Sequence, residues 1–246
     1  MNKKEIVRIL FGIVLMIVLI ITGMHILKDS LIKMGYKSFI KTEKDYIKAA
    51  QYHMKKKYGD EFESEYYYDG SIYSHPVNHP DWKVIIDVEI EKGKVYFHDN
   101  YVGFLKKAEL ESYIYELIKP IYGECKVYTR PYGFPLDDSW NKDTDIMTYA
   151  YSGDYATHIF TYDRIENKDE DLKKTCDIFM ENTLESNVIN VTYLTQNYFE
   201  SFEEKSIDYT YNSYKYFYSL ATIYNKRTGA GFSEVNILKG KEEYGE

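Results

Sequence analysis

The chain has 246 residues and a formal net charge of −8, and 44% of its residues are hydrophobic. That hydrophobic share excludes an intrinsically disordered chain, and the acidic balance argues against nucleic acid as a partner, because the chain would repel phosphate backbones. Tyrosine is in excess, with 28 residues against 12 phenylalanines and 2 tryptophans. This excess favours a tyrosine-faced β-sheet, and the alternative is a stacking surface for a ligand such as a sugar or a peptide.

The first predicted element is an apolar helix over residues 9–27, ILFGIVLMIVLIITGMHIL. A bilayer core of about 30 Å is spanned by roughly 20 apolar helical residues, so this run is long enough to cross a membrane. Lys3, Lys4 and Arg8 precede it, and such basic flanks stay in the cytoplasm, which predicts an extracytoplasmic C-terminal domain at the cell membrane. A cleaved signal peptide is the alternative, but the run is long, and neither a small-x-small cleavage site nor a lipobox cysteine follows it. Residues 1–27 are therefore predicted to be a cytoplasmic tip and a single-pass signal-anchor.

Residues 28–41 form a basic, amphipathic stalk, which either lies on the membrane surface or continues the helix. The first α+β half, residues 42–130, begins with a helix. Thr42 and Asp45 have the spacing of a capping box, and Gly59 is a typical helix stop after lysines in the last turn. The other elements predicted in this half are a strand over 61–68, an irregular loop over 71–81, a strand hairpin over 82–98, a helix over 104–118 that Pro120 ends, and a strand over 124–129.

Residues 131–144 form the one long polar connection and separate the first half from a second half over residues 145–246. Both halves run in the order hairpin, helix, strand, which indicates either two similar ββαβ units or the ordinary alternation of α+β folds. The predicted fold class is α+β, with an N-terminal transmembrane helix followed by helices packed on antiparallel β-sheet. The elements predicted in the second half are strands over 145–151 and 155–164, a helix capped by Asn167, a strand over 188–194, a short helix over 197–205, a strand over 209–224, a turn over 225–231 and a strand over 232–238.

One part of the first half resembles a known class of domains. The helix that ends at Lys57, Tyr58 and Gly59, followed by the hairpin over residues 82–98, is similar to the cystatin-like and peptidase-propeptide class of secreted α+β domains. The resemblance implies a binding or inhibitory module, and it carries no residue's role over to this chain, because fold does not fix function.

His75 and His79 are candidates for a metal site because two histidines four residues apart ligate zinc well on one face of a helix. Here a proline follows each histidine, which excludes a helix, and a third ligand is wanting. An exposed, proline-stiffened loop is therefore the expected structure. No cofactor is predicted.

Oxygen-bearing side chains stand at every second position from Asp137 through Asp143 to Asp145. This is the ligand spacing at the start of a calcium-binding loop. The pattern departs from an EF-hand because Lys142 stands where the sharp-turn glycine belongs and Thr148 where the bidentate glutamate belongs. A solvated polar linker is the favoured interpretation, and no metal site is predicted.

Cys125 and Cys176 are the two cysteines of the chain. A cysteine pair in an extracytoplasmic domain tends to be oxidised, but a disulfide requires that the strand near Cys125 and the helix around Cys176 pack together. The alternatives are a disulfide and two buried thiols. Neither cysteine stands beside a histidine in a nucleophile pattern.

The sequence contains no GxSxG, HExxH, SxxK or glycine-rich phosphate motif, and its histidines form no cluster. The preferred interpretation is therefore a non-enzymatic, membrane-anchored extracytoplasmic domain that binds a protein or another partner in the cell envelope. One alternative is an envelope hydrolase with a carboxylate site that the sequence does not reveal. Another is a structural membrane-surface protein that acts mainly through the basic stalk.

Overall fold

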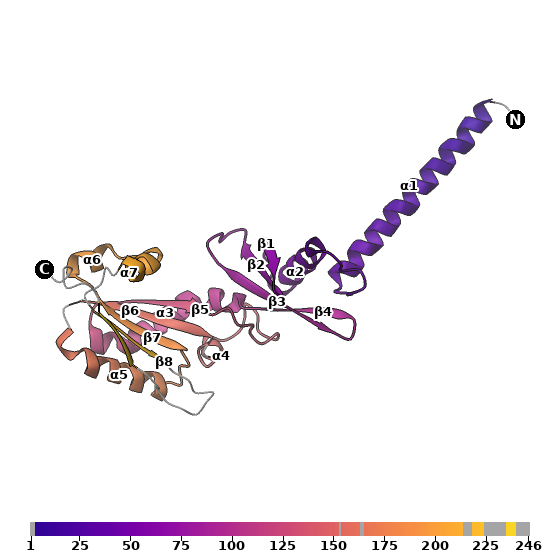
Figure 1. The fold of residues 1–246 in the computed structure, drawn as a ribbon. Coiled ribbons are helices and arrows are strands. Elements are labelled where there is room, and N and C mark those ends of the chain that lie inside the picture. Colours follow the sequence, from indigo (N-terminus) through magenta and orange to yellow (C-terminus); the bar gives the residue numbers. More distant parts are fainter. Residues whose placement is uncertain (1–2, 153, 163–164, 214–217, 224–234, 240–246) are drawn as a thin grey trace. The chain divides into compact units, whose positions relative to one another are not determined.

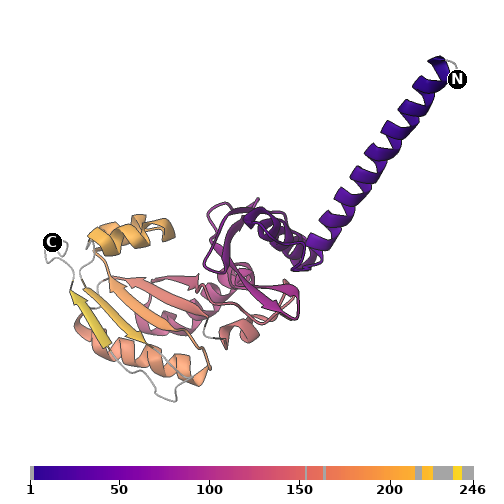
Figure 2. The ribbon, with the colours of Figure 1, turned by 45° about the vertical axis from the view of Figure 1, so that its right-hand side comes forward.

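The computed structural model describes residues 3–152, 154–162, 165–213, 218–223 and 235–239 (Figures 1 and 2). The chain divides into two compact units, Met1–Asp99 and Asn100–Glu246. The predicted polar connection, residues 131–144, belongs to the second unit. The α+β class is confirmed, since the first unit combines helices with a four-stranded sheet and the second combines helices with a five-stranded sheet.

Helix α1 (Lys3–Lys33) contains the apolar run and is about 46 Å long at a rise of 1.5 Å per residue. Its side chains from residue 10 to residue 28 are exposed. Among the described residues, this is the one helix that is long and apolar enough to cross a membrane. The first six residues of the predicted stalk continue the helix, which ends at Lys33.

Gly35 ends helix α1 in a left-handed conformation, with φ +75°. The Gly35 N–H donates to the carbonyl of Ile32 at 2.9 Å, and the Tyr36 N–H donates to the carbonyl of Leu31 at 3.1 Å. This pair of bonds is a Schellman motif, which satisfies carbonyl groups that a helix end otherwise leaves open. The chain thus leaves the helix through a defined turn.

The residues after this turn pair directly with the sheet of the first unit. The Val95 N–H donates to the Gly35 carbonyl at 2.8 Å, and the Lys37 N–H donates to the Gly93 carbonyl at 3.0 Å. A Cβ atom on Gly35 would lie 2.7 Å from the carbonyl oxygen of Val95, which is closer than real Cβ contacts. Glycine is therefore required at position 35 both by the backbone conformation and by the closeness of β4.

Replacing Gly35 with alanine is expected to destabilise the first unit by roughly 2 kcal/mol, through left-handed strain and the collision with Val95. Gly70→Ala is the matched control, because Gly70 also has a positive φ but would meet nothing within 4 Å. Urea unfolding followed by the fluorescence of Trp82, in a Trp140→Phe background, measures the first unit. Equal losses for the two variants would contradict the close approach of Val95.

Helix α2 (Glu43–Tyr58) has the predicted capping box. The Asp45 N–H donates to Thr42 Oγ1 at 3.3 Å, and the Thr42 N–H donates to Asp45 Oδ2 at 3.0 Å. Gly59 ends the helix with φ +84°, and its N–H donates to the Lys55 carbonyl. Both predicted ends of the helix are confirmed. An ion pair between Lys48 and Asp29 joins α2 to the end of α1.

The first sheet is an antiparallel meander in the order β1-β2-β3-β4. The predicted hairpin over residues 82–98 is confirmed. Its turn lies at Lys92 and Gly93, and both residues have the positive φ of a type I′ hairpin turn. The irregular loop predicted over 71–81 is wrong for its first six residues, which form β2. Pro76 is tolerated because it is the last residue of that strand. The strands are β1 (Phe62–Tyr68), β2 (Ser71–Pro76), β3 (Val84–Glu91) and β4 (Lys94–Asp99).

Helix α2 covers one face of the first sheet. Tyr46 of α2 stacks on Tyr67 of β1, with ring centroids 5.0 Å apart, and His53 of α2 lies against Phe97 of β4 at 5.7 Å. Buried apolar side chains fill the space between them. These residues are Ala49, Ala50 and Met54 of α2, and Phe62, Ile72, Val84, Ile86, Val95 and Phe97 of the sheet.

The second unit is built on a sheet in the order β5-β6-β7-β8-β9. Strands β6 and β7 are parallel, and the other neighbouring pairs are antiparallel. A parallel pair needs a crossover, which α5 supplies. The elements of this unit are α3 (Tyr101–Tyr122), β5 (Lys126–Pro131), α4 (Ile146–Ala150), β6 (Tyr155–Thr161), η1 (Ile165–Asn167), α5 (Lys168–Glu181), β7 (Val188–Tyr193), α6 (Gln196–Ser201), η2 (Glu204–Ser206), α7 (Ile207–Ser213), β8 (Tyr218–Ile223) and β9 (Val235–Lys239).

Three predicted elements of this unit differ from the structure. Residues 145–151 contain helix α4 rather than a strand, because the Asp145 carboxylate accepts from the Met147 N–H at 2.8 Å and caps a helix. The strand predicted over 209–224 is helix α7 up to Ser213 and strand only over 218–223. Helix α3 continues past Pro120 to Tyr122, since a proline this close to a helix end removes few backbone bonds. The predicted turn at 225–231 lies outside the described residues.

The predicted repeat of two ββαβ units is not present. The hairpin β3–β4 and strand β5, which were to flank the helix of the first repeat, belong to different sheets. In the second half, the first strand of the predicted hairpin is helix α4. The similar spacing of the two predicted units therefore reflects ordinary alternation of helices and strands.

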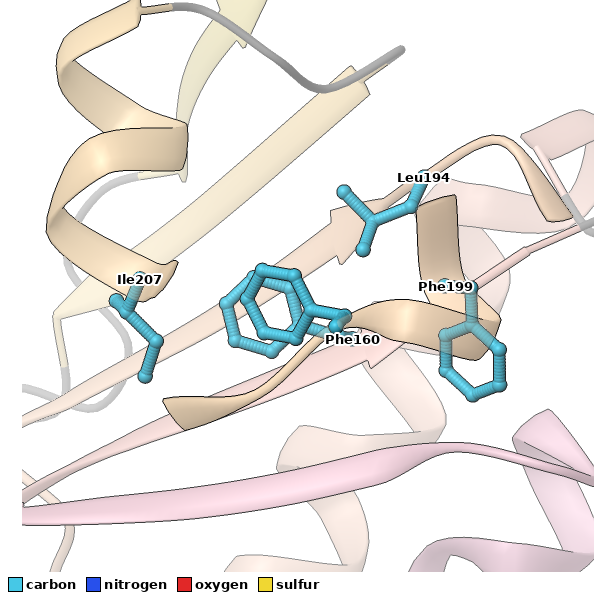
Figure 3. Close-up of a cluster of buried hydrophobic side chains, with 5 residues drawn as sticks. Phe160, Leu194, Phe199 and Ile207 are labelled. Carbon is cyan, nitrogen blue, oxygen red and sulfur yellow. The ribbon is translucent and has the colours of Figure 1, made fainter. Parts of the chain in front are cut away.

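Helices cover both faces of the second sheet: α3 and α5 lie on one side, and α6 and α7 on the other (Figures 1 and 2). Beneath α6 and α7, Phe160 of β6 is fully buried at the centre of a hydrophobic cluster (Figure 3). Lys126 of β5 fixes α6 to the sheet, because its ammonium donates to the carbonyls of Phe199 and Phe202 at 2.7 Å each. The cluster comprises Phe160, Leu194, Phe199, Phe202 and Ile207.

Candidate functional site

The candidate site is the outer face of the first sheet, opposite helix α2. Side chains alternate along each strand, so the residues between the buried ones point away from α2. Among the described residues of the first unit, no helix covers this face. We call it the tyrosine–carboxylate face. It consists of Glu63, Glu65, Tyr66 and Tyr68 of β1, Ser71, Tyr73 and His75 of β2, Ile85, Asp87, Glu89 and Glu91 of β3, and Lys94, Tyr96 and His98 of β4.

Tyrosine rings give this face an aromatic surface. Tyr66 stacks on Tyr73 across the β1–β2 pair, with ring centroids 4.7 Å apart and an angle of 23° between the rings. Tyr66, Tyr68 and Tyr96 are 45%, 68% and 42% exposed, respectively. Such rings offer a large contact area and a hydroxyl group at little cost in conformational entropy, and tyrosine is accordingly enriched in protein interfaces.

Carboxylates make the same face acidic. The face carries five carboxylates. Among the described residues that form it, Lys94 is the single lysine or arginine. Glu63 and Glu65 stand on either side of the imidazole of His75, with N···O distances of 3.5 and 3.7 Å. Glu89 lies 3.0 Å from Nε2 of His98. The three glutamate side chains are mostly exposed, so their charge is available to a partner from solution.

The structure does not bring the two predicted metal candidates of the first unit together. His75 lies in β2 between two glutamates, whereas His79 stacks on Trp82, with ring centroids 4.0 Å apart. In the described part of the chain, no group of three or more His, Cys, Asp or Glu side chains is arranged to hold a metal ion. His75 instead belongs to the tyrosine–carboxylate face.

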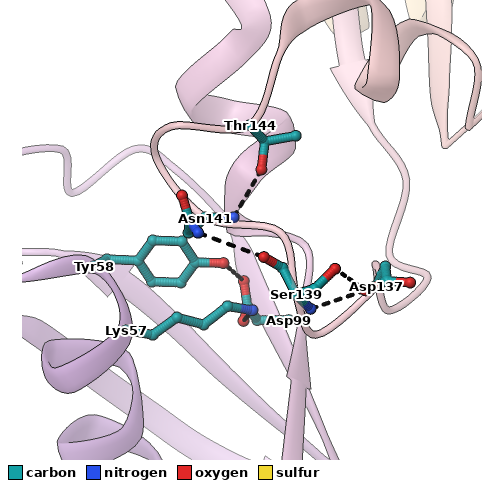
Figure 4. A network of polar contacts seen from close by, with 7 residues as sticks. All are labelled: Lys57, Tyr58, Asp99, Asp137, Ser139, Asn141 and Thr144. Atoms are coloured by element: carbon teal, nitrogen blue, oxygen red, sulfur yellow. Dashed lines mark hydrogen bonds and ion pairs between the residues drawn. The ribbon is translucent and has the colours of Figure 1, made fainter.

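Asp137 lies in a series of local turns in the second unit (Figure 4), and the backbone of Asp143 takes part in the same series. Asp137 Oδ1 accepts from both the N–H and the hydroxyl of Ser139, at 2.8 and 2.5 Å. Asn141 Oδ1 accepts from the Asp143 N–H at 2.8 Å, and Asn141 N–H donates to Thr144 Oγ1 at 2.8 Å. The oxygens of Asp137 and Asn141 are thus engaged with nearby backbone, as is usual for Asp and Asn in turns.

Cys125 and Cys176 are both free and buried. Burial raises the pKa of each thiol to about 12. A thiol with such a pKa is almost wholly protonated at neutral pH, and only the thiolate is an effective nucleophile. The two side chains therefore behave as small hydrophobic residues of the second unit.

Sequence reasoning missed the tyrosine–carboxylate face because β2 was assigned to a loop. The alternation of Asp87, Glu89 and Glu91 with apolar residues marks the polar side of β3, but without β2 no neighbouring strand places Tyr66 and Tyr73 beside each other. The usable signal was the alternation of Ile72, Ser74 and Pro76 with the polar residues between them. Pro76 and Pro80 favoured a loop instead of a strand over these residues.

A second polar cluster lies beneath α7 in the second unit. Asn190 Nδ2 and the Tyr211 hydroxyl lie 3.3 and 3.4 Å from Nδ1 of His158. An amide nitrogen can only donate, so Nδ1 accepts and the imidazole is neutral. Burial, together with the nearby charge of Arg130, lowers the pKa of His158 to about 4. The cluster links α7 to β6 and β7, and it has the contacts of a buried structural network.

The stability of the second unit should depend on pH through His158. Its pKa is about 4 in the folded state and near 6.5 when the chain is unfolded, so only the unfolded state takes up the proton as the pH falls through this range. The free energy of unfolding therefore carries no penalty from His158 above pH 6.5, and it falls by roughly 3 kcal/mol as the pH drops from 6.5 to 4. His158→Gln should remove this difference. Unfolding measured by Trp140 fluorescence in a Trp82→Phe background tests it, and identical pH profiles for the two proteins would contradict it.

No protein-family model matches the chain, and no curated protein matches it. Among solved structures, it is similar to the crystal structure of a DUF5037 family protein from Ruminococcus gnavus ATCC 29149. The match has a TM-score of 0.36 and 15% sequence identity, and it covers 70% of this chain and 88% of that chain. A likeness of this size supports neither a family assignment nor a function.

Proposed function

We propose that the protein is a non-enzymatic binding module, anchored in the cell membrane by α1 and displayed outside the cell, whose tyrosine–carboxylate face binds a protein partner with a basic surface. One observation carries the proposal: a sheet face that no helix in the described part of the first unit covers, and that combines exposed tyrosine rings with five carboxylates. The apolar, exposed α1 supports the anchor, and the basic residues before it support a cytoplasmic N-terminus.

The chemistry of the face indicates the kind of partner. Exposed carboxylates attract a basic surface over several ångströms and raise its rate of association, whereas the rings supply area that is buried on contact. A basic protein meets both requirements. Anionic wall polymers and nucleic acids would instead be repelled.

Photocrosslinking in cells that produce the full chain tests the proposal. A benzophenone amino acid at position 68 should give a discrete protein adduct, and the same group at position 209, an exposed tyrosine of α7, should not give it. Glu63→Lys combined with Glu89→Lys should abolish the adduct, because both changes reverse charge on the face. An adduct that persists in this variant, or no adduct at position 68, would count against the proposal.

Affinity for the captured partner provides the second measurement. Tyr68→Ala should weaken binding of the purified partner about tenfold or more, since truncating an interface tyrosine commonly costs 1–2 kcal/mol. Tyr209→Ala is the matched control, because Tyr209 is exposed to a similar degree but lies in the second unit. Equal affinities for wild type and Tyr68→Ala would exclude this face as the binding site.

A further inference from the structure

A second surface of the first unit surrounds the point where α1 ends. Its apolar rings and side chains are exposed, and lysines stand among them. We call it the basal collar. It consists of Lys33, Met34, Tyr36, Lys37, Phe39 and Lys41 of the chain after the span, Tyr52 of α2 and Lys94 of β4.

The position of the collar along the chain places its start at the outer edge of the lipid headgroup layer once α1 spans a bilayer. The apolar run ends at Leu27, and α1 continues to Lys33, about 9 Å further along its axis at 1.5 Å per residue. A headgroup layer extends roughly 5–8 Å beyond the hydrocarbon on each side. The start of the collar therefore lies at the outer edge of that layer.

The collar combines the two kinds of side chain that favour this layer. Aromatic residues concentrate at membrane interfaces, where the ring lies among the glycerol groups and the polar end stays in water. The Lys33 ammonium lies 5.7 Å from the centre of the Tyr52 ring, and the Lys94 ammonium lies 5.6 Å from that of Tyr36. Each pair presents a cation beside an aromatic ring. The cation suits a lipid phosphate, and the ring suits the apolar glycerol carbons next to that phosphate.

The charge of the collar contrasts with that of the chain. Residues 28–41 include four lysines and one aspartate, which gives them a charge of +3 in a chain of net −8. The aspartate, Asp29, is itself paired with Lys48. An anionic surface therefore attracts this stretch and repels most of the remaining chain.

The collar is also held in place. The Schellman turn at Gly35 and the two backbone bonds to Gly93 and Val95 fix the residues after α1 on the sheet. These two bonds make up the isolated antiparallel bridge between Tyr36 and Lys94. A surface that is already ordered loses little conformational entropy when it binds, so a small number of lysines suffices.

We propose that the basal collar binds the phosphate groups of anionic phospholipids in the leaflet from which the domain emerges. The inference rests on the proposed function in one respect, namely that α1 spans the membrane, and it adds a second surface that shares only Lys94 with the tyrosine–carboxylate face. Each lysine near an anionic membrane surface strengthens membrane binding about fivefold. The lipid contact thus fixes the first unit against the membrane.

Tryptophan fluorescence of the full chain in nanodiscs tests the proposal. Phe39→Trp, in a background in which Trp82 and Trp140 are phenylalanine, places the probe in the collar. The nanodiscs contain brominated phosphatidylcholine, either alone or mixed with brominated phosphatidylglycerol. We expect stronger quenching in the mixture, and Tyr68→Trp in the same background, on the tyrosine–carboxylate face, should be quenched equally weakly in both.

A charge variant separates lipid binding from simple proximity. Lys33→Gln, Lys37→Gln and Lys41→Gln together should abolish the difference between the two lipids at position 39. Lipid binding by the collar would be contradicted if quenching at position 39 did not depend on phosphatidylglycerol or on the three lysines. The proposed anchor would not be affected by that result. A chain that fails to remain with the nanodiscs would instead overturn the anchor and, with it, both proposals.

Discussion

Replacing Phe160 with alanine is expected to lower the free energy of unfolding of the second unit by about 3–5 kcal/mol. Phe160 is fully buried, and its ring lies 4.2 Å from that of Phe202 and about 6 Å from that of Tyr128. Removal of the ring leaves a cavity between the sheet and the segment that carries α6 and α7. Because natural domains are stable by only about 5–15 kcal/mol, this is a large share of the total.

The measurement is urea unfolding of the full chain in mild detergent, with Trp140 as the single tryptophan. The ring of Trp140 packs edge-on against Tyr149 in the second unit, so its emission reports the unfolding of that unit. Phe134→Ala is the matched control, because it removes the same atoms from an exposed side chain and should cost less than about 0.5 kcal/mol. A loss for Phe160→Ala as small as that of the control would show that α6 and α7 do not pack on β6.

Replacing Asp99 with alanine is expected to lower the stability of the first unit by about 3 kcal/mol. The side chain of Asp99 is fully buried; it accepts from Lys57 Nζ at 2.9 Å and from the Tyr58 hydroxyl at 2.7 Å (Figure 4). The Lys57 side chain is only 13% exposed. Without the carboxylate, a largely buried ammonium loses its charged partner and the Tyr58 hydroxyl loses one acceptor, and a buried charge without its partner is costly.

Two variants distinguish this cause from a general loss of packing. Adding Lys57→Met to Asp99→Ala should recover part of the loss, because the buried charge is then absent. Glu91→Ala, which removes a carboxylate paired with Lys92 on the surface, should cost between 0 and 1 kcal/mol. Trp82 fluorescence in a Trp140→Phe background measures all three. A double variant less stable than Asp99→Ala alone would contradict the proposed role of the ion pair.

Local sequence signals predicted the elements whose ends are set by nearby residues. The capping box at Thr42, the stop at Gly59 and the hairpin at Lys92 depend on contacts within a few positions, and the structure has all three. Two elements of the second unit were predicted wrongly. Residues 145–151 have a strand-like composition that masks the local cap at Asp145, which makes them a helix. The residues after Ile207 form a helix because they pack on the second sheet, and this contact joins positions far apart in the chain.

The candidate site was predictable only in part for the same reason. The polar side of β3 was visible as an alternation, and the tyrosine excess was visible as composition. The face exists because β2 pairs with both β1 and β3, and this pairing brings Tyr66 beside Tyr73 and His75 beside Glu63. Assigning residues 71–76 to a loop removed the strand that joins β1 to β3, and with it the cross-strand neighbours that form the face.

The turn at Gly35 has a consequence for how the protein would find its partner. A domain on a flexible linker explores a volume whose radius grows with the square root of linker length. Here the chain passes from the last turn of α1 into backbone bonds with β4 within two residues, so almost no slack separates membrane and domain. In the proposed topology, the domain diffuses laterally at constant height, and the search for a partner in the same membrane becomes two-dimensional. Inserting a glycine–serine linker after Lys33 would let the domain occupy a range of heights above the membrane and so lower the effective concentration of the two proteins.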